Sequence, residues 1–344
     1  MEAYLYEHLD EDRVRCRLCS HRCVVAPAAR GICGVRENQG GTLVSLVYGR
    51  LIARHVDPIE KKPLFHLAPG SLSYSIATVG CNFSCRFCQN ADIAQMPADH
   101  HGRISGEAAT PESVVAAAEQ AGCRSIAYTY TEPTVFFEFA HDTARLASAR
   151  GLKNVFVTNG YMSAEALDMV APYLDAANVD LKAFDDGFYK RQCGARLKPV
   201  METLERMAEK GVLVEVTTLI IPGLNDDPVL LGDMARFLVD ALGPDTPWHI
   251  SRFHPTYRLT DRSPTPPATL FAAAKIGKDA GLRYVYTGNI PGQGGESTHC
   301  WQCGACVIER IGFTVRAVRL RNGACRECGA TIAGVEMGGA GKTD

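Results

Sequence analysis

The chain has 344 residues, 46% of them hydrophobic and 22% charged, which is typical of a globular protein with one large domain and small appendages. Its formal net charge of -2 gives no electrostatic reason to expect a nucleic acid or a membrane surface as a partner. The acidic N-terminal stretch and the lack of a run of roughly 20 apolar residues predict a cytoplasmic location without a membrane anchor.

The 14 cysteines are clustered along the sequence. In a reducing cytosol, clustered cysteines indicate metal ligands or catalytic groups and not disulfides. Cys123 and Cys193 stand alone, and we expect them to be small buried hydrophobic residues. The others form three groups: Cys16, Cys19, Cys23 and Cys33; Cys81, Cys85 and Cys88; and Cys300, Cys303, Cys306, Cys325 and Cys328.

Residues 1–70 are predicted to be an N-terminal cysteine-rich region that carries the first group. Four thiolates suffice for zinc or for an auxiliary iron–sulfur cluster, and their spacing does not choose between the two because both accept four cysteines. His21 is a further candidate ligand that would replace one cysteine, although it also suits an exposed turn.

Residues 71–292 show β-branched runs that alternate with segments of helical period, which indicates repeated βα units and a parallel sheet. We expect strands at 72–80, 124–130, 153–159, 175–181, 212–220, 248–253 and 282–288. We expect helices at 111–122, 133–151, 164–171, 199–210, 228–241 and 267–280, the first of them capped by Thr110. About six units are too few for a closed eight-stranded barrel, so the pattern predicts a partial (β/α)6 TIM-like barrel.

Polar residues follow several of these strands, where the loops of such a barrel form its mouth. Caps and turns also use such residues, but their convergence on one face favours a site. These residues are Glu132, Asn159, Asp180, Lys182, Arg252 and His254.

Cys81, Cys85 and Cys88 follow the first predicted strand, so their loop lies at the mouth. Three thiolates can ligate three irons of a 4Fe-4S cluster and leave the fourth iron open, whereas a structural zinc needs a fourth ligand. An incomplete zinc site that borrows a distant histidine is the alternative.

The segment C-N-F-S-C-R-F-C, residues 81–88, resembles the signature of radical S-adenosylmethionine (radical SAM) enzymes. The resemblance implies that Cys81, Cys85 and Cys88 bind the cluster and that its open iron chelates S-adenosylmethionine. It implies reductive cleavage to a 5'-deoxyadenosyl radical, which abstracts hydrogen from a substrate. Phe87 would pack near the adenine.

Y-T-E-P, residues 130–133, stands where the family commonly has G-G-E-P, and by resemblance Glu132 would bind the amino group of the cofactor. Tyr130 and Thr131 replace the two glycines. T-N-G at 158–160 and D-L-K at 180–182 are similar to segments of glycyl-radical-enzyme activases. The similarity implies that Asn159, Asp180 and Lys182 contact the methionine and ribose portions.

The layout over residues 12–336 resembles the radical SAM proteins of the AmmeMemoRadiSam system, relatives of pyruvate formate-lyase activating enzyme. The resemblance implies a ferredoxin or flavodoxin as electron donor, a possible protein substrate, and AMMECR-type or Memo-type partners. I-P-G-L-N-D (221–226) and G-N-I-P-G (288–292) would shape the later part of the mouth. Arg252, His254 and Tyr257 are candidates to line the substrate pocket.

Residues 293–344 contain two C-x2-C pairs, Cys300/Cys303 and Cys325/Cys328, each followed by glycine, which resembles a zinc ribbon. An auxiliary iron–sulfur cluster is the alternative. Cys306 is followed by valine, so we leave it outside the ligand set, although it is a candidate to replace Cys300.

A second class of function is a zinc-binding, cysteine-rich module that binds nucleic acid or protein. Its only local basic signal is a set of arginines in the terminal module, which a solvated face also explains. These are Arg310, Arg316, Arg319 and Arg321. The radical SAM interpretation therefore leads.

Overall fold

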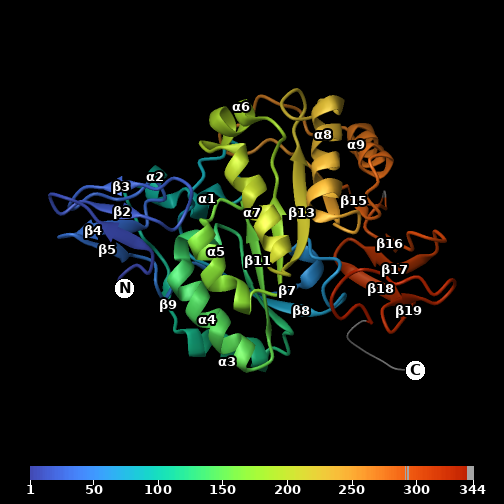
Figure 1. Cartoon of the computed structure of the whole chain (residues 1–344), viewed down its shortest axis with the longest axis horizontal. Helices are drawn as coiled ribbons and strands as arrows, with labels where there is room; N and C mark the ends of the chain where they lie inside the picture. Colours follow the sequence, from blue (N-terminus) through green and yellow to red (C-terminus); the bar gives the residue numbers. More distant parts are fainter. Residues whose placement is uncertain (291, 293, 339–344) are drawn as a thin grey trace.

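The centre of the computed structural model is an eight-stranded sheet (Figure 1). The structure describes residues 1–290, 292 and 294–338, so Pro291 of the predicted G-N-I-P-G segment and parts of the predicted range 293–344 lie outside the described residues. Seven strands run parallel and follow one another across the sheet in chain order. They are β8 (Leu72–Ala77), β10 (Ser125–Tyr128), β11 (Lys153–Thr158), β12 (Ala176–Asp180), β13 (Leu213–Ile220), β14 (Trp248–Arg252) and β15 (Val285–Gly288).

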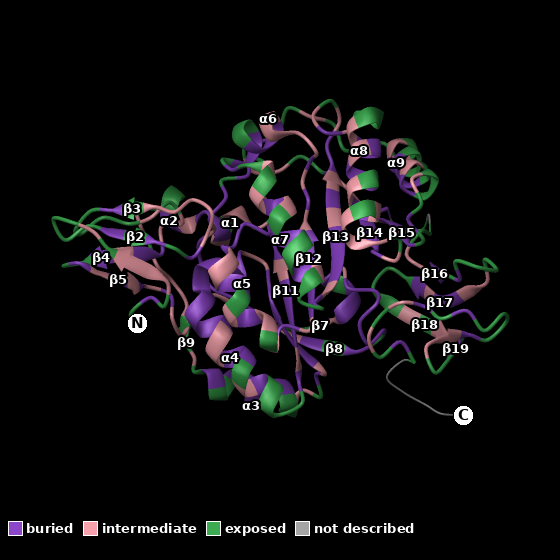
Figure 2. Ribbon diagram, in the orientation of Figure 1, coloured by how far each residue is buried: buried purple, intermediate pink, exposed green. Residues whose placement is uncertain are grey.

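Six helices connect these strands in turn and cover one face of the sheet. They bury the side that faces the strands and expose the other (Figure 2). The sheet stays open between its edge strands, which confirms the partial barrel. Thr110 caps the first helix as predicted, because its side chain accepts a hydrogen bond from Ser113 N. The helices are α3 (Pro111–Gln120), α4 (Phe137–Ala149), α5 (Ala164–Val170), α7 (Leu197–Glu209), α8 (Pro228–Phe237) and α9 (Pro267–Asp279).

One strand of the main sheet precedes the predicted core. The strand β7 (Ala53–Pro58) pairs antiparallel with β8, so the sheet begins inside the segment 1–70. The short 3-10 turn η1 (Ile59–Lys61) follows it. Leu64 and Leu67 then pack against Ala127, Val155 and Ala176 of the parallel strands. Residues 59–67 therefore cover one end of the barrel, and we call them the closing segment.

The N-terminal cysteines lie in a module of small sheets, seen on the left of Figure 1. Arg36 of this module forms an almost fully buried ion pair with Glu138 of α4. Arg17 and Arg22 contact Glu165 of α5, so the module is fastened to the outer helices. Its strands are β1 (Tyr6–His8), β2 (Val14–Cys16), β3 (Val24–Val25), β4 (Arg36–Gln39) and β5 (Thr42–Ser45), and β6 (Arg50–Leu51) pairs with β9 (Glu107–Ala108).

The C-terminal module lies on the opposite side of the sheet (Figure 1) and has its own hydrophobic cluster. Arg310 of this module is buried against Glu60, with Nε to Oε1 at 3.4 Å, and its Nη2 donates to Phe65 O at 2.8 Å. The module therefore docks on the segment that closes the barrel. Its strands are β16 (Thr298–His299), β17 (Cys306–Ile311), β18 (Thr314–Val318), β19 (Leu320–Arg321) and β20 (Ala324–Cys325). Among the described helices, none is long and apolar enough to span a membrane.

Candidate active site and metal centres

The loop after β8 carries Cys81, Cys85 and Cys88 at the carboxyl end of the sheet, as predicted. Gly80 sets its path. This glycine has φ +97, and a Cβ atom there would lie 2.5 Å from Val35 Cγ1, so no larger residue fits without a shift. The backbone N of Ser84 donates to Cys193 O at 2.9 Å, which pins the loop from the other side.

The three sulfurs of this loop are not set as closely as those of a zinc–thiolate site. Four thiolates on one zinc lie about 3.8 Å apart, because each Zn–S bond is about 2.3 Å and the geometry is tetrahedral. Among the described residues, the only group with three or more ligand atoms within 4.8 Å of one another lies in the C-terminal module. Cys81, Cys85 and Cys88 do not form such a group, and as three thiolates they would leave one iron of a 4Fe-4S cluster without a protein ligand.

The three thiols have different proton affinities. Burial, followed by the nearby Glu132 carboxyl, raises the pKa of the Cys81 thiol well above its usual value. Burial raises the pKa of Cys88 to about 11. Cys85 differs, because a hydrogen bond from Cys193 and the charge of Lys182 lower its pKa. Cys193 is buried as predicted, but it also contacts this ligand, a role that an isolated cysteine in the sequence did not signal.

A cavity of about 390 Å³ opens beside these cysteines, within the range of volumes that bind small molecules and cofactors. All three cysteines line it, together with Phe87, Asn159, Asp180 and Lys182, each a predicted site residue. The structure thus brings seven of the eight predicted central residues to one cavity.

Glu132 is the eighth, and it lies behind the cavity wall. Its side chain is fully buried and is not among the lining residues. Its Oε1 accepts from Thr134 N at 3.0 Å and from Thr158 Oγ1 at 2.8 Å, and its Oε2 accepts from Asn159 N at 2.8 Å. Burial raises the pKa of Glu132 and these hydrogen bonds oppose the rise. In this geometry Glu132 positions Asn159, and the direct cofactor contact stays a prediction.

Asn159 connects the strand ends to the cysteine loop. Its Nδ2 donates to Asn82 Oδ1 at 2.7 Å and lies 3.7 Å from Cys81 Sγ. Hydrogen bonds to ligand sulfurs shift the reduction potential of an iron–sulfur cluster. Asn159 is therefore placed to orient Cys81 and to adjust such a cluster.

Asp180 and Lys182 form an ion pair at the end of β12, with Nζ to Oδ2 at 3.0 Å. The ammonium lies 5.7 Å from the ring centroid of Phe87, a cation–π contact. Burial would lower the pKa of Lys182, but Asp180 and the neighbouring thiols raise it well above its usual value. The Lys182 ammonium therefore supplies a fixed positive charge beside Cys85.

The cavity has further polar lining residues that the sequence did not reveal. Lys62 rises into it from the closing segment and pairs with Asp57 at 2.7 Å, and Asp57 also accepts a hydrogen bond from Tyr130 OH. Burial lowers the pKa of Lys62 to about 8 although Asp57 opposes the shift. Asn178 Oδ1 and Thr217 Oγ1 are buried atoms without a hydrogen-bond partner. Asn178 lies on the same face of its strand as Asp180, so the two-residue period of a strand could have identified it as a lining residue.

The predicted substrate residues are not brought to this cavity. Arg252, His254 and Tyr257 are absent from its lining, whereas Ser251 is present. The Arg252 side chain donates to Thr265 O at 2.8 Å, and Tyr257 OH donates to Asp99 at 2.9 Å. Both side chains are held by these hydrogen bonds, and a part in substrate binding for Arg252, His254 and Tyr257 stays a prediction.

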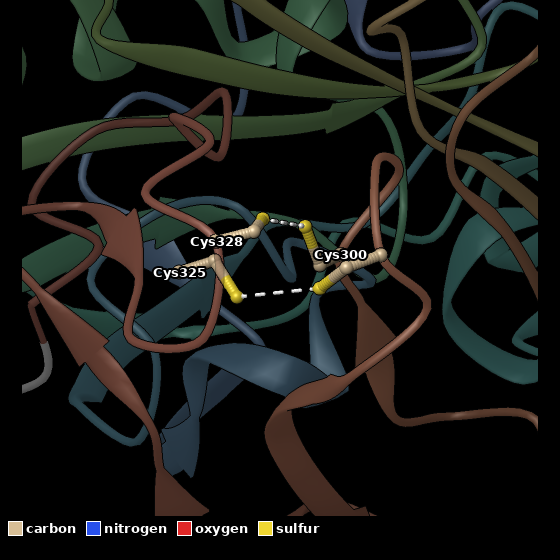
Figure 3. Close-up of side chains that lie close together, drawn as sticks. Cys300, Cys325 and Cys328 are labelled. Carbon is tan, nitrogen blue, oxygen red and sulfur yellow. Dashed lines mark hydrogen bonds between the residues drawn. The ribbon is translucent and has the colours of Figure 1, made fainter.

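The C-terminal module holds the close-set group of ligand atoms. The sulfurs of Cys300, Cys303, Cys325 and Cys328 all lie within 4.8 Å of one another (Figure 3). Cys300 and Cys328 are 3.6 Å apart, and Cys303 and Cys325 are 3.8 Å apart. These distances match the edge of a tetrahedral zinc–thiolate site. Cys306 is not in the group, in agreement with its exclusion.

Two arginines of this module are engaged in contacts within the protein. Arg310 is buried in its contacts with Glu60 and Phe65. Arg319 pairs with Glu309 at 2.7 Å. Two of the four arginines behind the nucleic-acid alternative are therefore neutralised within the protein.

The N-terminal cysteines surround a separate cavity. Cys16, Cys19, Cys23 and Cys33 all line it. His21 lines it too, but its Nε2 donates to Asn82 O at 2.7 Å. The four thiols are thus brought together, and His21 is tied to the cysteine loop of the active site.

Comparison with known proteins places the chain in a family. The Radical SAM superfamily model matches residues 75–232. An uncharacterized protein of Methanocaldococcus jannaschii is 45% identical over 333 residues, which cover 96% of this chain and 98% of that protein.

Pyruvate formate-lyase 1-activating enzyme of Escherichia coli K12 is 24% identical over 156 residues, or 43% of this chain and 61% of the enzyme. The crystal structure of a radical SAM methyltransferase from Sphaerobacter thermophilus has the same fold, with a TM-score of 0.51 at 17% identity over 64% of this chain and 67% of that one. With its open parallel sheet and its three-cysteine loop, the chain belongs to the radical SAM superfamily and is related to the activating enzymes.

Proposed function

We propose that the protein is an enzyme that cleaves S-adenosylmethionine reductively at a 4Fe-4S cluster held by Cys81, Cys85 and Cys88. The observation that carries this proposal is the cavity of about 390 Å³ that these cysteines share with Phe87, Asn159, Asp180 and Lys182. Membership of the superfamily supports both cofactors.

The residues present fit the cluster. Three thiols of one loop line the cavity, and the described part of the chain places no fourth cysteine on its wall. When bound, the cluster would supply the electron that cleaves the sulfonium, and the 5'-deoxyadenosyl radical so formed would abstract a substrate hydrogen.

The protein's own groups have separate tasks around this centre. Asn159 orients Cys81 through its contact with the sulfur. Lys182 keeps a positive charge beside Cys85 and favours its thiolate. Phe87 would offer an apolar surface to the adenine, and Tyr130 and Thr131 line the cavity, where their backbone would bind the cofactor's amino group.

The substrate would bind beside the polar residues of the cavity wall that the cofactor does not need. Lys62, Asn178 and Thr217 offer a donor and two unpaired oxygens there, which favours a substrate carbon flanked by amide or carboxylate groups. A backbone glycine of a protein partner has that chemistry, and the relation to activating enzymes supports it. We therefore propose a protein substrate, an electron donor of the ferredoxin or flavodoxin class, and AMMECR-type or Memo-type partners.

The test is product formation under anaerobic conditions. Reconstituted protein with dithionite and S-adenosylmethionine should release 5'-deoxyadenosine, and Cys85→Ala should reduce the yield to background. Cys123→Ala is the matched control, since it removes a buried cysteine that lines none of these cavities. Equal product from Cys85→Ala and the control would refute the assignment.

A further inference from the structure

The closing segment places two lysines on the wall of the active-site cavity. Lys61 and Lys62 both line it, and their ammonium groups pair with the single carboxylate of Asp57 at 2.8 and 2.7 Å. The other charged residues among the described lining residues, Asp180 and Lys182, pair with each other. Two ammonium groups therefore share one anion, which leaves an excess of positive charge at this part of the wall.

Lys62 carries this positive charge into the protein. Its side chain is only 1% exposed. Besides Asp57, its Nζ contacts Tyr130, with the phenol oxygen at 3.4 Å and the ring centroid at 4.4 Å. An ammonium has three N–H donors, so Asp57 and Tyr130 leave one of them for a bound molecule. A buried ammonium without a full set of acceptors is costly, and an anion in the cavity would complete the set.

Tyr130, which contacts both Asp57 and Lys62, has a strained backbone. Its φ is +63, in the left-handed region that glycine adopts easily and other residues adopt rarely. Its phenol donates to Asp57, and its carbonyl oxygen accepts a hydrogen bond from Asn90 Nδ2 at 2.7 Å. Strain of this kind persists only where surrounding contacts hold it, and it concentrates at functional sites. These contacts fix the carboxylate and the ammonium relative to each other.

A buried hydrogen-bond acceptor without a partner lines the same cavity. Asn178 is fully buried, and its Oδ1 accepts no hydrogen bond from the described residues. Its Nδ2 donates to Pro63 O at 2.7 Å, so Asn178 also anchors the residue that follows Lys62. The wall therefore offers a cation to an anionic group of a bound molecule and an oxygen to an N–H group.

We propose that this part of the cavity is a carboxylate-binding subsite, in which Lys62 binds a carboxylate of the substrate and Asn178 accepts a hydrogen bond from a substrate N–H group. The inference rests on the proposed function, since it describes the substrate of that site. An N-acylated amino acid or a peptide has both groups. Its carboxylate would come from the end of the chain or from an acidic side chain beside the reacting carbon.

The charge of Lys62 makes this subsite sensitive to pH. Burial lowers the pKa of Lys62 to about 8 although Asp57 opposes the shift, and the charge of Lys61 lowers it further. Burial would raise the pKa of Asp57, but hydrogen bonds from Lys61, Lys62 and Tyr130 lower it, so Asp57 stays ionised. Burial and the bond to Asp57 raise the pKa of Tyr130 well above its usual value. A carboxylate should therefore bind below about pH 8 and be released as the pH rises above it.

Binding of small probes to the anaerobically reconstituted, unreduced protein tests the subsite without turnover. N-acetylglycine has a terminal carboxylate, N-acetylglycyl-aspartic acid α-amide has only a side-chain carboxylate, and N-acetylglycinamide has none. By isothermal titration calorimetry at pH 7, at least one carboxylate probe should have a Kd at least about tenfold lower than that of the neutral amide. The tighter of the two identifies the source of the carboxylate. Equal affinity for all three, or binding of none, would overturn the proposal.

Variants and pH test whether Lys62 is the group that binds. Lys62→Gln should remove the preference for the carboxylate, whereas Lys62→Arg should keep it up to pH 10, where the wild type loses it. Lys198→Gln changes an exposed lysine and should behave as the wild type. A preference retained in Lys62→Gln would overturn the assignment.

Affinity for S-adenosylmethionine separates a substrate role from a cofactor role. In equilibrium dialysis, Lys62→Gln should change this affinity by less than about twofold, because Lys62 is assigned to the substrate. A larger loss would show that Lys62 binds the cofactor and would overturn the subsite. If the wild type forms no 5'-deoxyadenosine, the proposed function fails, while the ratios of the probe Kd values still judge the subsite.

Discussion

Glu132→Gln tests whether the buried carboxylate positions the active site or binds the cofactor directly. In the wild type, Glu132 Oε1 accepts hydrogen bonds from Thr134 and Thr158, and Oε2 accepts one from Asn159 N at 2.8 Å. Glutamine keeps one oxygen for Thr134 and Thr158, but its NH2 group then faces Asn159 N and cannot accept that bond. The change loses one charge-assisted bond and leaves a buried N–H unpaired, so the free energy of unfolding should fall by about 1.5–3 kcal/mol. Because Asn159 then loses its anchor, affinity for S-adenosylmethionine should fall at least about tenfold, or about 1.4 kcal/mol.

The assays are urea unfolding of the metal-free chain and equilibrium dialysis of the reconstituted protein with labelled S-adenosylmethionine. Glu205→Gln, on the exposed side of α7, is the matched control and should change neither quantity. If Glu132→Gln weakens cofactor binding without lowering stability, the carboxylate contacts the cofactor itself and the positioning role is wrong. If it changes neither, Glu132 does not support the site at all.

Three further outcomes follow from buried or paired groups. Arg310→Met strands the buried carboxylate of Glu60 and should lower the free energy of unfolding by about 3–5 kcal/mol, with more than half recovered when Glu60→Gln is added; an unrecovered loss in urea melts would contradict the pairing. Arginine contacts lower the pKa of Glu165 to about 2 from 4.5, so its contribution of about 0.5–1 kcal/mol is present above pH 4.5 and is lost as the pH falls toward 2. Glu165→Gln should therefore reduce stability at pH 7 but not at pH 2, and an equal reduction at both would refute the linkage. Cys193→Ala should shift iodoacetamide alkylation of Cys85 in the metal-free chain to higher pH, and an unchanged profile by mass spectrometry would exclude their hydrogen bond.

The parallel core was predictable because its strands and helices each carry a local period. The β-branched run of β11 and the capped helix α3 signal themselves within a few residues. The antiparallel strand β7 could not be predicted in this way. Its sequence, A-R-H-V-D-P, has several exposed residues, and it forms a strand because it pairs with β8. Pairing partners are a long-range property that a local pattern does not encode.

In the candidate site, too, some residues could be predicted from the local sequence and others could not. Cys81, Cys85 and Cys88 could be read because the ligands are adjacent in the chain. The burial of Glu132 behind Asn159 depends on where two strand ends meet, which no spacing reveals. Lys62 reaches the lumen only because the preceding turn folds beneath the sheet.

The two cysteine-rich modules show that the sequence alone does not identify a bound metal. For both groups of four cysteines the sequence admits zinc or an iron–sulfur cluster, and only the positions of the sulfurs can add to that. Cys300 and Cys328 lie 3.6 Å apart, which fits a tetrahedral zinc–thiolate site. The N-terminal thiols line a cavity of their own, which the spacing of their cysteines in the sequence did not reveal.

The central claim is that one iron beside Cys81, Cys85 and Cys88 is free to bind S-adenosylmethionine. Electron nuclear double resonance of the reduced protein with cofactor labelled with 15N at its amino group tests it directly. The account predicts hyperfine coupling between that nitrogen and the cluster, present in Cys123→Ala and absent in Cys85→Ala. A reduced cluster that shows no coupling to the labelled nitrogen in the wild type would contradict it.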